Sequence, residues 1–177
     1  MRPCGPSGRP SPVRTTLGLL LLFLAVPLQA ALAGGPAGGV DLSLVATYFC
    51  GLYYGKGAGV GSGAALGLFL DGCTLGPPGQ HLVGRSLAGY LAGAFGERVV
   101  QRGPLLHAVA LALLTAAVHL AEWTLLPVAG AVAPPAAELL GRLALEVPLT
   151  AAAGAVLVVA AERVGLGPRD TTYYPHR

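Results

Sequence analysis

Long apolar blocks dominate this sequence and decide which solvent the folded chain can occupy. Six blocks, separated by short breaks rich in glycine, proline or charge, fall at residues 15–33, 40–54, 57–75, 81–99, 104–126 and 136–162. Crossing about 30 Å of hydrocarbon takes about 20 helical residues, and all blocks but the second approach that length. Hydrophobic residues make up 54% of the chain and charged residues 11%, a balance typical of membrane proteins. We therefore predict an all-α integral membrane protein, a bundle of six transmembrane helices.

The basic residues predict the orientation of these helices. If the chain crosses six times, nine of the eleven Lys and Arg residues fall on one side: Arg2, Arg9, Arg14, Lys56, Arg98, Arg102, Arg163, Arg169 and Arg177. Retained positive charge marks the cytoplasmic side, so both termini are predicted to be cytoplasmic. Residues 1–14 then form a basic, Pro-rich leader, residues 15–163 the six-helix transmembrane domain and residues 164–177 a cytoplasmic tail.

The first block also has features of a secretory signal peptide. Arg9 and Arg14 precede its apolar run, and Ala31-Leu32-Ala33 resembles a small-residue cleavage site. Cleavage would leave five spans and an external N-terminus. Because a polytopic protein does not require a removable signal, and because six spans fit the basic residues better, we favour a retained anchor helix.

Small residues recur every fourth position in the third and fourth blocks. The glycines with this spacing are Gly55, just before the third block, Gly59, Gly63 and Gly67 in the third block, and Gly89 and Gly93 in the fourth. In lipid no hydrophobic force joins helices, and small-x-x-x-small faces let two backbones come into van der Waals contact. The spacing predicts close packing between the third and fourth helices, with a face for a partner protein as the alternative.

The glycine-rich segment does not match a catalytic or nucleotide-binding motif. The pattern G-x-x-x-x-G-K-[ST] is absent, and Ser62 lacks the nucleophile-elbow frame because Val60 occupies its first glycine position. The three cysteines lack metal-site spacing, and the basic residues form no aromatic-interleaved patch of the kind that binds nucleic acid. We expect no enzyme activity, no cofactor, no metal and no nucleic-acid partner.

Ionisable residues inside spans cost about 2.5 to 3.5 kcal/mol each, so each one needs a partner or a role. Asp71 and Arg85 flank a short Gly/Pro turn, which puts them within reach of a local ion pair; separate solvation in the headgroup layer is the alternative. If the fifth and sixth helices form an antiparallel hairpin, Glu122 and Arg142 lie at comparable depth. We predict that these two face each other as a structural brace, since a proton or ligand pathway would need further acidic or histidine residues deeper in the bundle.

The order of these features resembles the rod shape-determining protein MreD family of bacteria. The resemblance covers nearly the whole chain and rests on the anchor helix, Val40-Asp41-Leu42, the glycine series up to Gly67-Leu68-Phe69-Leu70-Asp71, Leu75-Gly76, Gly89-Tyr90-Leu91-Ala92-Gly93 where the family has G-Y-L-x-G, and Glu122. The chain departs from the family in its Pro-rich leader and in Leu120 and Ala121, which stand where the family has an aromatic residue before Glu122.

The resemblance implies a non-enzymatic, multi-pass protein of the bacterial cytoplasmic (inner) membrane that acts in cell elongation, rod shape and peptidoglycan synthesis. The implied partners are the bitopic MreC, the RodA glycosyltransferase with its penicillin-binding transpeptidase, the actin-like MreB filament and membrane lipid. The alternative is the substrate-binding component of an energy-coupling-factor vitamin transporter, also a six-helix bundle. That component would need a polar cavity open to the outside and an Ala-x-x-x-Ala face on its first helix, and residues 17–33 show no such repeat in their centre.

Overall fold

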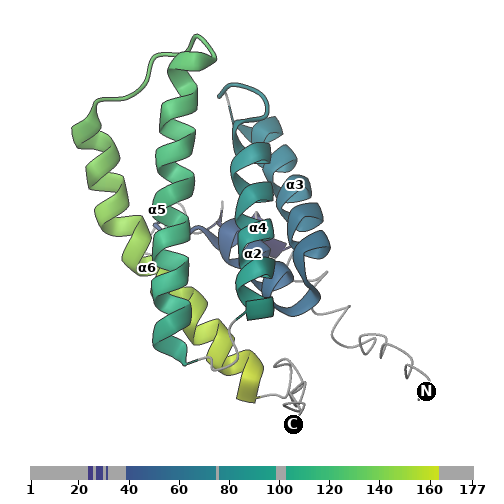
Figure 1. Ribbon diagram of the computed structural model, residues 1–177. Coiled ribbons are helices and arrows are strands. Elements are labelled where there is room, and N and C mark those ends of the chain that lie inside the picture. Colours follow the sequence, from purple (N-terminus) through teal and green to yellow (C-terminus); the bar gives the residue numbers. More distant parts are fainter. Residues whose placement is uncertain are drawn as a thin grey trace.

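The computed structural model describes residues 24–25, 27–29, 31, 39–74, 76–98 and 103–163. All regular secondary structure in these residues is helical. The successive elements are α2 (Leu42–Tyr54), α3 (Lys56–Cys73), α4 (Gln80–Arg98), α5 (Pro104–Val128) and α6 (Ala136–Arg163). Figure 1 shows α3, α4 and α5 running alongside one another, with α6 crossing behind α5. The predicted blocks from residue 40 onward coincide with these helices; the leader, the tail and most of the first block lie outside the described residues.

Helix α5 continues past its predicted end at residue 126, and Gly130 beyond it closes the helix. Block five was expected to stop at Leu126, before Pro127, but α5 continues through Pro127 to Val128. Gly130, with φ +77°, donates its N–H to the carbonyl of Pro127, and Ala131 donates to the carbonyl of Leu126. This pair of bonds is a Schellman motif, which satisfies the last carbonyls of the helix and ends it.

Helix α2 is the centre of the bundle. Nine of its thirteen residues are buried, and they lie on all sides of the helix: Ser43, Leu44, Val45, Ala46, Thr47, Tyr48, Phe49, Gly51 and Leu52. At 1.5 Å per residue, α2 is about 20 Å long, shorter than the hydrocarbon layer. Helices α3 and α4 provide most of its contacts within the bundle.

A single residue, Gly55, reverses the chain between α2 and α3. Its φ of 88° lies in the left-handed region, where a side chain would be strained. Gly55 is therefore not part of the glycine stripe in which the sequence placed it, because it precedes the first residue of α3. No atom lies within 4 Å of a Cβ built on it.

Helices α3 and α4 pack backbone against backbone along the other glycines of the stripe. A Cβ on Gly63 would lie 2.9 Å from the amide nitrogen of Ser86 and closer still to the carbonyl of Arg85. A Cβ on Gly59 would meet the carbonyl of Gly89 in the same way. These contacts match the predicted packing of the third helix against the fourth, and they show that the stripe is occupied within this chain.

Gly67 and Gly93 extend the same contact toward the two ends of the helix pair. A Cβ on Gly67 would lie 2.6 Å from the Cα of Leu82, near the start of α4. A Cβ on Gly93 would lie 2.6 Å from the Cα of Lys56, at the start of α3. The backbones therefore stay close over most of the length of the two helices.

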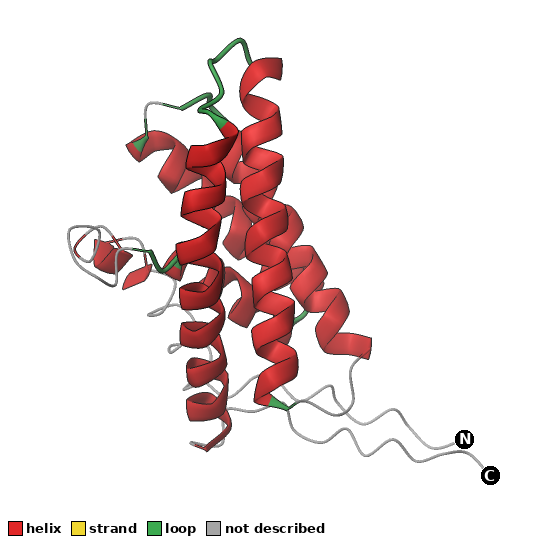
Figure 2. Ribbon diagram, turned by 90° about the vertical axis from the view of Figure 1, so that its left-hand side faces the viewer, coloured by secondary structure: helices red, strands yellow, loops and turns green. Residues whose placement is uncertain are grey.

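Helices α5 and α6 differ from this pair in composition. Among the described residues, Pro104–Val128 and Ala136–Ala161 are the two helices long and apolar enough to cross a membrane by length and composition. Only 28% and 22% of their most apolar windows are buried, so their apolar faces point outward, unlike those of the core helix of a soluble protein. The loops that join α3 to α4 and α5 to α6 lie at the same end of the bundle (Figure 2).

Candidate functional site

A group of polar side chains joins α2, α4, α5 and α6 near the end of the bundle that carries the α3–α4 loop. Its members, which we call the polar cluster, are Asp41, Ser43, His81, Arg85, His119, Glu122, Glu146 and Thr150. Five of them, including all three charged groups at its centre, are buried. The polar cluster is thus buried alongside an apolar core that includes Leu44, Leu111 and Val158.

The guanidinium of Arg85 on α4 connects α2 to α5. Its Nη2 donates to Oδ2 of Asp41 at 2.8 Å, and its Nη1 donates to Oε1 of Glu122 at 2.9 Å. Its Nε donates to the hydroxyl of Ser43 at 2.7 Å. The planar fork of an arginine suits this arrangement, because separate N–H groups bind separate acceptors in one plane.

Asp41 precedes α2 and binds three helices at once. Its Oδ1 accepts hydrogen bonds from the hydroxyl of Ser43 at 2.6 Å and from the N–H of Leu44 at 2.9 Å, which makes it the N-cap of α2. Its own N–H donates to the hydroxyl of Thr150 on α6 at 2.9 Å. Together with the Arg85 ion pair, these bonds link the start of α2 to both α4 and α6.

Glu122 is the central acceptor of the cluster on the α5 side. Its Oε1 receives Arg85 and also lies 2.8 Å from Nδ1 of His81, while its Oε2 lies 3.6 Å from Nδ1 of His119. Nε2 of His119 in turn lies 3.0 Å from Oε2 of Glu146 on α6. Charged contacts therefore extend from α4 through α5 to α6, although the contacts of His119 lack hydrogen-bond geometry.

Burial makes this arrangement energetically demanding. Arg85, Asp41 and Glu122 are 3%, 4% and 6% exposed, so little solvent screens their charges. Taking such groups out of water is repaid only if the ion pairs are well aligned and additional hydrogen bonds complete them. Losing one partner from a buried pair costs about 3 to 5 kcal/mol, so the cluster specifies how these helices meet.

The structure corrects the predicted pair between Asp71 and Arg85. Arg85 turns toward α2 and α5, and Asp71 instead accepts backbone N–H groups at the start of α4: Oδ2 from Gly79 at 3.0 Å and Leu82 at 3.1 Å, and Oδ1 from His81 at 2.9 Å. The first N–H groups of a helix have no partner within it, and a carboxylate there is also favoured by the helix dipole. Asp71 thus closes the α3–α4 turn.

The predicted pair between Glu122 and Arg142 is also wrong. Arg142 is on the outside of α6, where its Nη2 donates to Oε1 of Glu138 one turn earlier, at 2.8 Å. The side chains of Arg142 and Glu138 are 66% and 49% exposed. The hairpin topology that motivated the prediction is present, but depth alone does not fix which face of α6 meets α5.

Asp41 is the central residue that the sequence reasoning about ion pairs missed. It was noted only in the Val40-Asp41-Leu42 resemblance, although an Asp directly before an apolar helix is an N-cap signal. His119 on α5 and Glu146 on α6 also belong to the cluster, next to Glu122 and to each other. The local sequence around these residues does not indicate that they contact Arg85 or Glu122.

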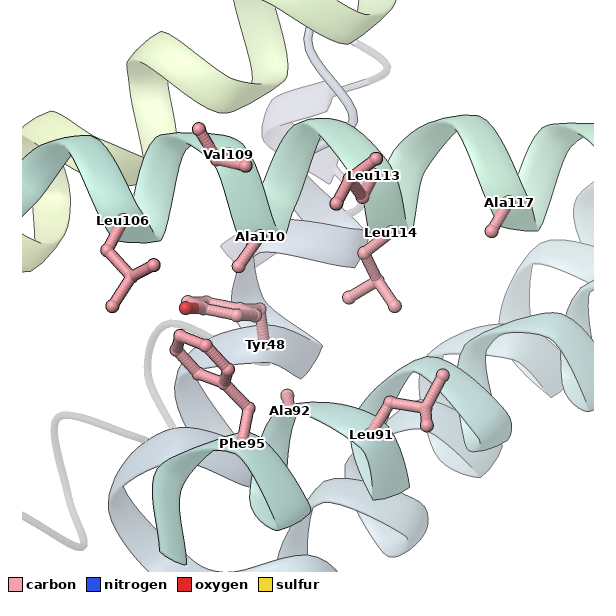
Figure 3. Close-up of a pocket in the computed structure, with 10 residues that line it drawn as sticks. All are labelled: Tyr48, Leu91, Ala92, Phe95, Leu106, Val109, Ala110, Leu113, Leu114 and Ala117. Atoms are coloured by element: carbon pink, nitrogen blue, oxygen red, sulfur yellow. The ribbon is translucent and has the colours of Figure 1, made fainter. Parts of the chain in front are cut away.

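An apolar groove lies between parts of α4 and α5 (Figure 3). It measures about 400 Å³, with Leu91 and Phe95 of α4 on one side and α5 residues such as Leu106 and Leu113 on the other. Tyr48 of α2 lies at its base, and the hydroxyl of Tyr48 is 2.7 Å from Nδ1 of His107. Within the described residues, no group of three or more His, Cys, Asp or Glu side chains is arranged to hold a metal ion.

These features define an all-helical bundle with a buried charged cluster, exposed apolar side chains and a glycine-packed helix pair. In comparisons with family models, curated proteins and solved structures, none matches this chain. The assignment of a function therefore rests on the residues and geometry described above.

Proposed function

We propose that this chain is a non-enzymatic scaffold of the bacterial cell-elongation machinery in the cytoplasmic membrane. In this proposal the bundle crosses the membrane six times with both termini cytoplasmic, the first crossing being residues 15–33. Its partners are MreC, the RodA glycosyltransferase with its penicillin-binding transpeptidase, and the MreB filament. Its role is to link the filament on the cytoplasmic side to peptidoglycan synthesis outside.

One observation carries the membrane part of the proposal: the polarity of the bundle is inverted. Charged Asp41, Arg85 and Glu122 are buried, whereas large apolar side chains face outward. Those between 64% and 77% exposed include Leu68, Leu105, Leu113, Leu140 and Val156, on α3, α5 and α6. Lipid favours exposed apolar side chains and requires charges to face inward.

The residues that carry the MreD resemblance also have defined places in the fold, which supports the scaffold assignment. Asp41 and Glu122 both bind Arg85, and Asp71 closes the turn into α4. Gly89 and Gly93 lie against the backbone of α3. Each of these positions maintains the shape of the bundle, as expected of a protein whose task is to present a rigid surface.

The scaffold proposal predicts which surfaces bind partners. Gly59, Gly63 and Gly67 are covered by α4, so this stripe is not open to a partner's helix. Partner helices then have to use the outward apolar faces. The described loops are short, so most of the contact area lies within the membrane or at its edges.

Crosslinking in native membranes, followed by purification of the tagged chain and mass spectrometry, tests the partners. We expect MreC and the wall synthases to be recovered above the level obtained with an unrelated multi-pass protein of similar abundance. Recovery of an ATPase-driven coupling module in their place would overturn the proposal in favour of the vitamin-transporter component.

The topology has a separate test that uses a natural thiol. Cys73, at the end of α3, is exposed and lies at the end of the bundle predicted to be external. A membrane-impermeant thiol reagent should label Cys73 in intact spheroplasts. In a background with Cys4→Ser and Cys73→Ser, Gly103→Cys should be labelled only after permeabilisation. The reverse pattern would contradict the cytoplasmic placement of the termini.

A further inference from the structure

A second apolar groove, separate from the one at Tyr48, lies where α6 crosses the beginning of α5. It measures about 340 Å³ and is lined by Pro104 of α5 and by a stripe of α6: Ala155, Val156, Val159, Ala160 and Arg163. The α6 positions follow helical spacing, so they form one continuous face. At 1.5 Å per residue, this face extends for about 12 Å along the helix.

The chemistry of the groove changes from one end to the other. Its α6 wall consists of small alanine and valine side chains, with Val156 67% exposed, and it ends at the exposed side chain of Arg163. Among the described residues, the ion pairs involve Lys56, His81, Arg85, His119 and Arg142, but not Arg163. The groove thus offers a hydrocarbon surface with a single cationic group at its end.

We propose that this groove binds an anionic phospholipid, with an acyl chain along α6 and the phosphate at the guanidinium of Arg163. A guanidinium binds phosphate oxygens through two parallel N–H donors. An acyl chain matches a wall that presents no hydrogen-bonding side chain before Arg163. The occupant is amphipathic and negatively charged at one end, complementary to the groove at both ends.

The groove at Tyr48 provides an internal comparison. It is of similar size, about 400 Å³, and its lining contains no charged residue. The one hydroxyl in that lining, on Tyr48, is already bonded to His107. Both grooves can accept hydrocarbon, but only the groove at Arg163 can distinguish an anionic headgroup from a zwitterionic one.

Native mass spectrometry of the full chain in detergent tests the proposal, using phosphatidylglycerol and phosphatidylcholine with identical acyl chains. A basic residue near a membrane surface contributes about 1 kcal/mol toward an anionic lipid, so we expect roughly a fivefold preference for phosphatidylglycerol. Arg163→Gln should remove the preference and Arg163→Lys should keep most of it. Retention of the full preference in Arg163→Gln would overturn the proposal.

Arg142→Gln is the matched control, because it removes the same charge from the opposite end of the same helix. It should leave the preference intact; an equal loss would mean that only net charge attracts the lipid, and the groove would not be the site. Val156→Trp fills the groove and should weaken binding of phosphatidylglycerol, whereas Leu113→Trp alters the rim of the Tyr48 groove and should not. Equal effects of these two variants would also contradict the assignment. Neither lipid result depends on which proteins are recovered by crosslinking.

Discussion

The α3–α4 pair and the contact of α5 with the rest of the bundle are held together by opposite means. Between α3 and α4 the contact is mainly one of backbones, which Gly59 and Gly63 bring together. Between α5 and the rest of the bundle the contact is made by long polar side chains, with Glu122 bound to Arg85 and His119 next to Glu146. A groove remains between parts of α4 and α5, whereas the glycine contact leaves no space for a methyl group.

The difference teaches how tightly each kind of contact specifies geometry in lipid. Backbone packing acts only at short range, so a methyl group added at the contact is not tolerated. Any helix of matching shape can make this contact, because it does not depend on the chemistry of the partner. Ion pairs are directional and select their partners, but long side chains can span a wider separation. The α3–α4 pair therefore fixes distance, and the polar cluster fixes which faces of α2, α5 and α6 point inward.

The largest effect is expected from Arg85→Gln. The substitution leaves Asp41 and Glu122 buried without their cation, and breaking a buried pair in this way costs about 3 to 5 kcal/mol. We expect a large drop in the unfolding free energy, measured in mixed detergent micelles by circular dichroism, and loss of accumulation in the membrane.

A charge-free version of the cluster tests whether the cost comes from unpaired charge. The triple variant Arg85→Met, Asp41→Asn, Glu122→Gln removes all three charges at once and should recover a substantial part of the stability lost in Arg85→Gln, since neutral replacement of buried ion pairs is often tolerated. A triple variant that is less stable than Arg85→Gln would show that the ion pairs stabilise the fold directly.

The glycine contact is tested by Gly63→Ala against Gly61→Ala, two identical changes on α3. A Cβ at position 63 would press on the backbone of Arg85, which cannot move as a side chain does, so we expect a loss of about 1 to 3 kcal/mol. Position 61 has no atom within 4 Å of an added Cβ, so the helix propensity of Ala should stabilise α3 by up to about 1 kcal/mol. Equal unfolding free energies for the two variants would contradict the close packing.

The helix positions could be predicted from sequence because hydropathy and glycine periodicity are local properties. The four-residue spacing of Gly59, Gly63 and Gly67 defines a helix face, and the following block is the nearest helix for that face to meet. Gly55 has the same spacing but does not belong to this helix face. Its φ of 88° ends α2, and the glycine spacing does not show that a helix ends there.

The ion pairs could not be predicted because they depend on how each helix is rotated about its axis. Asp71 is closer to Arg85 in sequence than Asp41 is, yet backbone N–H groups of α4 occupy the carboxylate of Asp71. The partner of Arg85 lies 44 residues away, at the start of the central helix. Only the assembly of α2, α4 and α5 around one another brings these groups together.

Asp71→Ala has an intermediate expected effect. It distinguishes the contribution of the α3–α4 turn from that of the glycine contact between the two helices. The variant leaves the N–H groups of Gly79, His81 and Leu82 without their acceptor, a loss comparable to that of a helix cap, about 0.5 to 2 kcal/mol. Amide hydrogen exchange should speed up in the first turn of α4 while the amides beside Gly63 stay protected. Faster exchange along all of α4 would mean that the turn, rather than the glycine contact, holds the pair together.

The smallest effect is expected where a polar pair lies outside the bundle. Arg142 and Glu138 are one turn apart on α6 and mostly exposed, and surface pairs with this spacing contribute about 0.3 to 0.5 kcal/mol in water. A double-mutant cycle with Arg142→Gln and Glu138→Gln should give a coupling free energy no larger than this, falling further at high salt if the pair reaches the aqueous phase. The same cycle on Arg85 and Asp41 should give a coupling several times larger and nearly independent of salt. If the two cycles agree in size, burial does not distinguish the polar cluster from an ordinary surface pair, and the inverted polarity that supports a membrane location loses its energetic basis.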